Sequence, residues 1–109
     1  LEVSIKLEIE ALMEKNIKDQ YSEEIKKITN AGYSDISLKE IEPDLNTDFH
    51  THGFDAYACV LKGKFILHYN NKEHVLKPGN FIALSAKQLH SEKTSSLGAT
   101  ILLGKRYKN

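Results

Sequence analysis

Two histidines separated by a single residue, His50 and His52, are the side chains of this sequence best suited to bind a metal ion. In an extended strand, side chains two positions apart project from one face, so two imidazoles about 6.5 to 7 Å apart can reach the same divalent ion. A third histidine, His90, lies in a later segment with strand character. We interpret the three as one metal site. The competing interpretation is that they are surface residues of a half-exposed sheet.

Glu92 is the candidate catalytic residue, because it lies two positions after His90 and shares its strand face. A buried, isolated carboxylate is costly, which leaves three positions for it. It binds the metal, it hydrogen-bonds a histidine or water beside the metal, or it lies solvated at the rim near Lys93. We favour the second position, since a second pair of side chains two apart on a strand rarely both reach an ion that His50 and His52 already bind from the opposite side.

The composition predicts one globular domain with no nucleic-acid or membrane partner. The 109 residues contain 15 basic and 15 acidic side chains, for a formal net charge of zero, and no basic block is present. The single cysteine, Cys59, excludes an intramolecular disulfide and favours a reducing, cytoplasmic location. No apolar run approaches the roughly 20 residues that a membrane-spanning helix needs.

Residues 1–32 are predicted to be an N-terminal extension of a domain that occupies residues 33–109. The first nine residues alternate strictly between apolar and polar, which predicts a strand to about Ile9, followed by a helical turn or two through Lys15. A helical stripe that continues to Ile17 competes with this interpretation. An apolar strand face of this kind must be covered, so we expect a homodimer built partly from the extension.

A short helix is predicted from Ser22 to Gly32. Ser22 is a plausible N-cap, acidic residues follow it in the first turn, and Gly32 can adopt the left-handed conformation that ends a helix. Tyr21, Ile25 and Ile28 form a narrow apolar stripe, which we expect to pack on the rest of the domain or on a partner subunit.

From residue 33 onward, short apolar segments alternate with turns. Turns are predicted at residues 62–64 around Gly63, at Asn70-Asn71 and at residues 77–80, which contain Pro78-Gly79. Strands at intervals of about eight to twelve residues, without intervening helices, predict an all-β antiparallel sandwich or barrel. The expected strands cover residues 33–41, 48–52, 56–61, 65–69, 74–76, 81–84, 88–94 and 99–103.

From about residue 44 to residue 94, the chain resembles a single-domain cupin, a small antiparallel β-barrel of jelly-roll type. His50, His52 and Gly63 match the first cupin motif, in which His-x-His precedes a glutamate and then a glycine. Gly79 and His90 match the second motif at the expected spacing. The resemblance implies a jelly-roll barrel that binds a divalent transition metal (Fe, Mn, Zn or Ni) through the three histidines.

The sequence departs from the cupin pattern at several positions. Ala56 stands where the first motif has its glutamate, and Ser85 and Lys87 replace a proline and a glycine of the second motif. Asp55 is next to the missing glutamate and is a possible substitute through a small bulge, although strand parity points it to the opposite face from Ala56.

Strand parity also divides the neighbouring side chains between the two faces of the sheet. If Ala56, Ala58 and Val60 face the lumen of the barrel, then Tyr57 and Cys59 pack outside it, and Cys59 is an inert, packed thiol.

Four further aromatic residues are less informative candidates. His68 and His74 lie near the Asn70-Asn71 turn and are expected to be exposed hairpin residues rather than ligands. Phe49 and Phe54 flank the histidine pair and are interpreted as core residues or as the apolar wall of a ligand pocket.

The leading functional hypothesis is a metal-dependent enzyme that acts on a small molecule inside the barrel. The cupin resemblance implies a dioxygenase, isomerase or lyase, and fold resemblance alone does not choose among them. The alternatives are a non-catalytic domain that binds or senses a small molecule, and a barrel that no longer holds metal.

Overall fold

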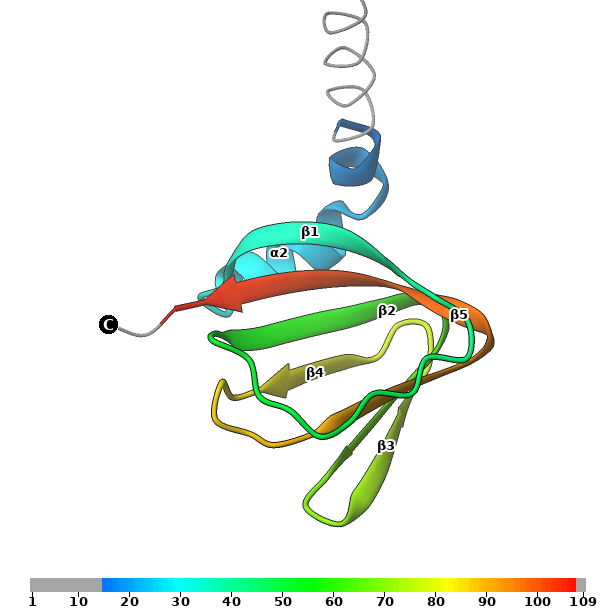
Figure 1. The fold of residues 1–109 in the computed structure, drawn as a ribbon. Helices are drawn as coiled ribbons and strands as arrows, with labels where there is room; N and C mark the ends of the chain where they lie inside the picture. The colour runs from blue at the N-terminus through cyan, green and yellow to red at the C-terminus, as the bar shows by residue number, and fades with distance from the viewer. Residues whose placement is uncertain (1–14, 108–109) are drawn as a thin grey trace, which may run out of the picture.

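The computed structural model describes residues 15–107, in which five strands form one curved antiparallel sheet around a lumen (Figure 1). The sheet order is β1-β5-β2-β3, and β4 also pairs with β2. The predicted all-β antiparallel barrel with a helical N-terminal part is confirmed. The strands are β1 (Ser34–Ile41), β2 (Asp55–Tyr69), β3 (Lys72–Leu76), β4 (Phe81–Leu84) and β5 (Ser91–Arg106).

The two longest strands, β2 and β5, pair with each other and bend together. Their register shifts twice between Val60 and Phe65 of β2. Gly63 of β2 has φ +75° and Gly98 of β5 has φ +70°, and a Cβ atom on Gly63 would collide with the carbonyl oxygen of Gly98. The predicted turn at residues 62–64 is therefore wrong. Gly63 marks an irregularity inside one continuous strand, where two backbones approach too closely for any side chain.

The same bend explains why β5 is one strand rather than the two that were predicted over residues 88–94 and 99–103. The polar, glycine-containing stretch between those segments continues the pairing with β2 through the bend. Each long strand thus contributes to both halves of the barrel wall.

The two other turns are as predicted. Asn70 and Asn71 have φ values of 53° and 61° and close the β2–β3 hairpin, where Tyr69 pairs with Lys72. Gly79 has φ +91°, and the turn that contains it is closed by a 2.9 Å hydrogen bond from Asn80 N–H to the carbonyl oxygen of Lys77.

The lumen is filled from the concave face of the sheet. Ala56, Ala58 and Val60 are all buried, and the latter two belong to the main apolar cluster on this face, so the predicted strand parity is confirmed. Tyr57 and Cys59 lie on the opposite, convex face. The other buried members of the lumen cluster are Phe65, Leu67, Leu76, Ala99 and Ile101.

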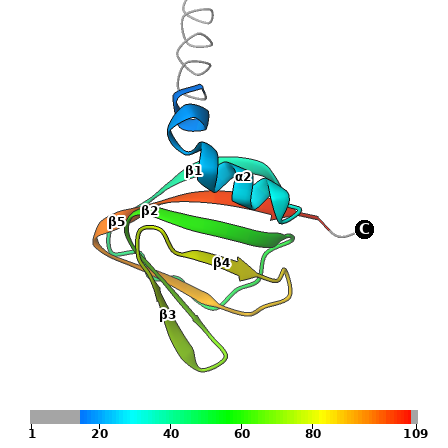
Figure 2. The ribbon, with the colours of Figure 1, turned by 180° about the vertical axis from the view of Figure 1, so that it is seen from behind.

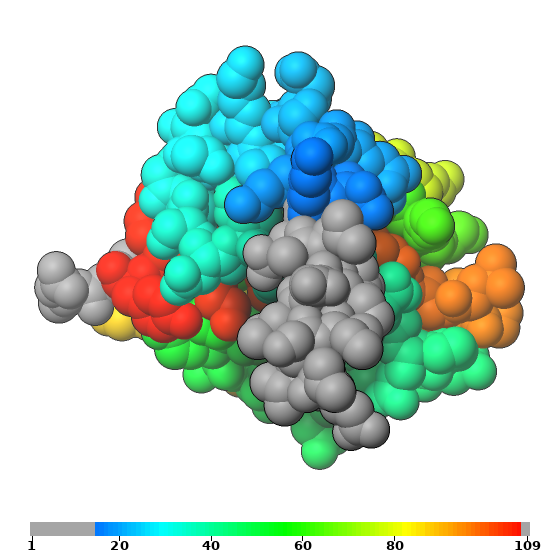
Figure 3. Space-filling view, turned by 90° about the horizontal axis from the view of Figure 1, so that it is seen from above, coloured from blue at the N-terminus to red at the C-terminus, as the bar shows by residue number. Residues whose placement is uncertain are grey.

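Helix α2 (Ser22–Asn30) packs on the convex face, away from the lumen (Figure 2). Ile28 is fully buried there against Cys59 and Leu102, and Tyr21 and Ile25 pack at the margin, so the apolar stripe contacts the domain as expected. Seen from above, the described helical residues and β1 form much of this surface (Figure 3).

The ends of α2 differ in how well the sequence predicted them. Ser22 is not the N-cap, because that position is held by Tyr21 and no side chain caps the helix. Gly32 ends the helix as predicted, with φ +94° and with hydrogen bonds from Gly32 N–H to Thr29 O (3.0 Å) and from Tyr33 N–H to Ile28 O (3.3 Å).

The strand predicted to end at Ile9 lies outside the described residues, whereas residues 15–20 are helical. The division at residue 32 and the homodimer stay predictions. Within residues 15–107, no helix has both the length and the apolar character needed to cross a membrane.

Candidate metal centre

The segment that carries His50 and His52 is not the strand that the alternation predicted. Within the predicted strand, residues 48–52, only His50 forms a bridge with the sheet, an isolated antiparallel bridge with His90 in which the two N–H···O=C bonds measure 2.9 and 3.0 Å. Next to the bridge, the Thr47 hydroxyl accepts the Glu92 N–H at 2.9 Å, in place of a backbone carbonyl. Side-chain hydrogen bonds thus compete with the ladder and leave the segment irregular.

Four side chains nevertheless converge, and we call them the histidine–glutamate cluster: His50, His52, His90 and Glu92. Each offers one ligand atom, and these atoms all lie within 4.8 Å of one another. Glu92 Oε2 lies 2.7 Å from His50 Nε2, 3.8 Å from His90 Nε2 and 4.0 Å from His52 Nε2. The Nε2 atoms of His52 and His90 are 3.2 Å apart. The convergence joins a loop before β2 to the beginning of β5.

Backbone carbonyls orient two of the imidazoles. His50 Nδ1 lies 2.8 Å from the Asp48 carbonyl oxygen, and His90 Nδ1 lies 2.9 Å from that of Gln88. A carbonyl oxygen only accepts hydrogen bonds, so both Nδ1 atoms must carry the proton. Both Nε2 atoms then point into the cluster, on the side from which a metal ion would be ligated.

The environment of His52 favours a neutral imidazole. His90 is fully buried, and His50, His52 and Glu92 are partly buried. Burial lowers the pKa of His52, and this outweighs the opposing effect of the Glu92 carboxylate. A histidine must be deprotonated at the ligating nitrogen to bind a metal, so the lowered pKa suits a ligand.

The donor set fits a divalent transition metal. Ligand atoms held about 2.0 to 2.2 Å from one ion lie about 3 to 4 Å from each other, which is close to the spacing found here. Three imidazole nitrogens and one carboxylate oxygen suit Zn, Fe, Mn or Ni, and this chemistry alone does not choose among them.

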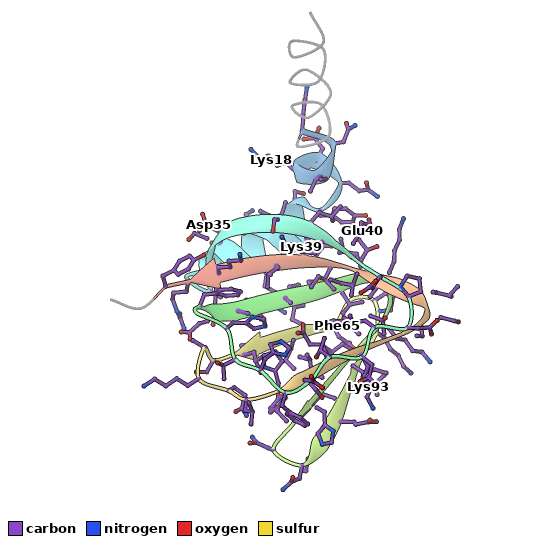
Figure 4. All side chains as sticks on the ribbon, viewed as in Figure 1. Lys18, Asp35, Lys39, Glu40, Phe65 and Lys93 are labelled. Atoms are coloured by element: carbon purple, nitrogen blue, oxygen red, sulfur yellow. The ribbon has the colours of Figure 1, made fainter. Side chains whose placement is uncertain are left out.

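An apolar cavity of about 180 Å³ adjoins the cluster inside the lumen. His52, His90 and Glu92 form part of its wall, and the Phe54 ring stacks on His52 at 5.1 Å. Phe65 projects into the lumen from β2 (Figure 4). The remaining wall residues are Lys39, Ile41, Ala56, Ala58, Leu67, Ile82, Leu84, Ile101 and Leu103.

Asp55 does not replace the glutamate missing at position 56. Ala56 lines the cavity as parity predicted, whereas Asp55 is buried on the other face. There its carboxylate accepts the Ala86 N–H at 2.9 Å and lies 3.5 Å from the Arg106 guanidinium. Asp55 therefore anchors the loop before β5 instead of facing the cluster.

The other aromatic candidates lie away from the cluster. His68 contacts Phe49 edge-on at 5.6 Å, and His74 stacks on Tyr69 at 4.1 Å. Both histidines are half-buried against these rings, so the expectation that they are exposed is wrong. Phe49 is 54% exposed, which makes it neither core nor pocket wall, whereas Phe54 is the pocket wall that was expected.

Two contributions to the site were missed by the sequence analysis. Thr47 holds the backbone at Glu92, and no motif indicates it. Lys39 lines the cavity from β1, and strand alternation with Ile41 is the signal that was available.

Comparisons with known proteins support the fold. No protein-family model matches the chain, and a search of curated proteins found no significant match. Among solved structures, a Rhizobium leguminosarum protein of unknown function is 15% identical with a TM-score of 0.62, over 67% of this chain and 69% of that one. A cupin superfamily protein from Desulfitobacterium hafniense is 15% identical with a TM-score of 0.59, over 67% and 66%. A cupin-2 domain protein from Shewanella frigidimarina is 16% identical with a TM-score of 0.56, over 65% and 69%.

These similarities define the class of fold. The chain has the fold of the cupin superfamily, as its histidine motifs predicted. It spans about two thirds of the length of these solved chains, and identities of 15–16% show the fold alone.

Proposed function

We propose that this protein is a metal-dependent enzyme that binds one divalent transition metal ion at the histidine–glutamate cluster and acts on a small molecule held in the adjacent lumen. His50, His52 and His90 are the proposed histidine ligands. Glu92 is the proposed fourth ligand and supplies, from β5, the carboxylate that Ala56 lacks. The bound ion would polarise an oxygen atom of the substrate.

The observation that carries this proposal is the side from which Glu92 approaches. Its carboxylate lies 2.7 Å from His50 Nε2, whereas the Nδ1 atoms are already bonded to backbone carbonyls. A carboxylate that only oriented a histidine would bind the outer nitrogen. We therefore propose that Glu92 binds the metal directly, in place of the position beside the metal that the sequence favoured. A catalytic role for Glu92 stays a prediction.

The cavity limits the size of the substrate. Its volume of about 180 Å³ is comparable to engineered apolar cavities of roughly 150 Å³ that hold a benzene molecule. We expect a compact apolar body of on the order of ten non-hydrogen atoms, with an oxygen donor directed at the cluster.

The test begins with elemental analysis of protein purified without a polyhistidine tag and reconstituted with Fe²⁺, Mn²⁺, Zn²⁺ or Ni²⁺ in turn. Stoichiometric binding of one ion supports the proposal, and content far below one ion per chain contradicts it. Screening the loaded protein for metal-dependent oxygen consumption and for isomerase or lyase turnover then tests catalysis.

A non-catalytic binding or sensing domain is the second candidate. It is favoured by one observation. Glu92 is the only carboxylate among the cavity-lining residues, and if it binds the metal, no carboxylate of the cavity wall is left to act as a general acid or base. Saturable binding of small molecules to the metal-loaded protein, without turnover, would decide for this candidate. The homodimer and the cytoplasmic location are proposed on the sequence alone.

A further inference from the structure

We propose that the ligand of the lumen is an anion with two oxygen-bearing ends, one at the metal and the other paired with the ammonium group of Lys39. This inference rests on the proposed function and names the substrate class of that same site. The observation behind it is the lining of the cavity. Apart from Lys39 and the members of the histidine–glutamate cluster, every residue that lines it is apolar.

Lys39 is the one lysine or arginine among the residues that line the cavity. It lies on β1, at the edge of the sheet (Figure 4), and pairs in register with Ile101 of β5. Alternation along β1 puts it on the same face as Ile41, which packs against the lumen cluster. Lys39 lines the cavity and is exposed as a residue, so its stem extends the apolar wall while its charged end can stay in contact with water.

No described carboxylate neutralises Lys39. The neighbouring acid Glu40 projects to the other face of the strand, where it accepts a hydrogen bond from the Thr100 hydroxyl at 3.2 Å. Within residues 15–107, the ion pairs of lysine and arginine join Lys93 to Glu73 and Arg106 to Asp55. Among the described residues, the ammonium group of Lys39 is thus available to pair with a ligand.

The charge balance of the cavity points to an anion. With a divalent ion bound, Glu92 offsets only part of the charge of the ion, and Lys39 adds to the remainder. A cleft with low-dielectric walls and charge of one sign concentrates ligands of the opposite sign. A neutral ligand would leave both positive centres uncompensated, whereas an acid with an apolar spacer satisfies the metal, the wall and the lysine together.

Lys105 provides a matched control. It lies on β5 near the cluster, with its ammonium group 4.6 Å from the centre of the Phe54 ring, and its charge contributes to lowering the pKa of His52. It has no described carboxylate partner either, but it does not line the cavity. Replacing Lys105 removes the same charge from the neighbourhood without removing the proposed contact.

The experiment compares pairs of probes on Co²⁺-loaded protein. Glutarate, adipate and pimelate are each titrated beside the monoacid of equal length, pentanoate, hexanoate or heptanoate, and the Kd is obtained from the change in cobalt absorption. A salt bridge between the solvent-exposed Lys39 and the second carboxylate predicts that the best diacid binds about two- to fivefold more tightly than its monoacid. That ratio should approach one in Lys39→Met and persist in Lys39→Arg and Lys105→Met.

Three results would overturn the inference: equal affinities of diacid and monoacid at every length, an unchanged ratio in Lys39→Met, or an equal loss in Lys105→Met. The cobalt content of each variant separates this failure from that of the proposed function. Wild-type protein that does not bind cobalt contradicts the metal site itself. Full cobalt content in all variants with an unaffected ratio contradicts only the role of Lys39.

Discussion

His50 and His90 face each other across one antiparallel bridge, and each donates its Nδ1 proton to the carbonyl oxygen of the residue two positions before it, Asp48 and Gln88 respectively. The bridge fixes the two backbones, and the two carbonyls fix the two rings. A metal ion would therefore meet imidazoles that are already oriented, which reduces the entropy lost on binding.

Removing one histidine of the cluster should abolish tight metal binding. We expect His52→Ala and His90→Ala to weaken metal affinity by more than the roughly ten- to hundredfold that the loss of an outer-shell partner costs. His68→Ala is the control, because it removes an imidazole that contacts Phe49 and lies outside the cluster. Metal content after reconstitution is the measurement, and equal content in all three variants would refute the assignment.

Glu92→Gln distinguishes a ligand from a group that only assists one. If the carboxylate binds the ion, the neutral amide should cost at least about a hundredfold in affinity. If it lies outside the ligand shell, metal should stay bound and activity should fall about ten- to a hundredfold. Calorimetric titration with Mn²⁺ separates these outcomes. A variant that matches wild type in metal binding, ligand binding and activity would place Glu92 outside the functional site.

Ala56→Glu should make the barrel depend on metal. Ala56 is 8% exposed and lines the cavity with Glu92, so a second carboxylate adds a buried charge near the first. We expect the metal-free protein to lose roughly 1 to 3 kcal/mol of unfolding free energy or more, and Mn²⁺ to restore it by accepting the new ligand. Thermal melts with and without Mn²⁺ measure both effects. Destabilisation that Mn²⁺ does not relieve would mean that position 56 does not reach the ion.

Cys59 should report the opening of helix α2. It is fully buried beneath Ile28, and burial, followed by the nearby Glu24, raises the pKa of its thiol above its ordinary value. Native protein should therefore react slowly with a disulfide reagent. A Cβ atom at Gly104 would collide with Ile28, whereas one at Gly53 meets nothing within 4 Å. Gly104→Ala should speed the reaction and Gly53→Ala should not, and equal rates would contradict this packing.

The same thiol predicts a pH dependence of stability. Between the pKa of Cys59 in the unfolded chain and its higher pKa in the fold, only the folded state keeps the proton. Its contribution to the free energy of unfolding is thus complete below pH of about 8.5 and is lost as the pH rises further. Denaturant titrations of wild type and Cys59→Ala at pH 8 and 10 should show a steeper decline in wild type.

The sequence predicted those features that depend on local geometry. Alternation assigned Ala56 to the lumen and Cys59 to the outside, and the Asn70-Asn71 pair located a hairpin, because each signal resides in adjacent residues. The turn predicted at Gly63 was wrong, because a glycine is needed there for the close approach to Gly98 on another strand. A glycine between two lysines looks like a turn until its partner is known.

The sequence predicted that the three histidines and Glu92 would lie near one another, but not how they are arranged. On a regular strand, the two histidines of His-x-His would project from the same face. In this protein the segment is a loop, and the bridge between His50 and His90 brings the side chains together instead. The position of Glu92 two residues after His90 predicted the correct side, but the sequence does not record that backbone carbonyls already hold the Nδ1 atoms of His50 and His90. Because the Nδ1 atoms are already hydrogen-bonded, the Glu92 carboxylate approaches the Nε2 side of these imidazoles.

The bend shared by β2 and β5 has a consequence for the order of folding. His50 and His52 precede β2, whereas His90 and Glu92 lie where β5 begins, so neither hairpin nor helix carries the whole cluster. The donors meet only after strands distant in sequence have closed the barrel, a slow type of step that a metal ion does not accelerate. An ion that binds only the closed form would leave the refolding rate unchanged and slow unfolding alone, so the metal would lengthen the lifetime of the native state without guiding the chain towards it.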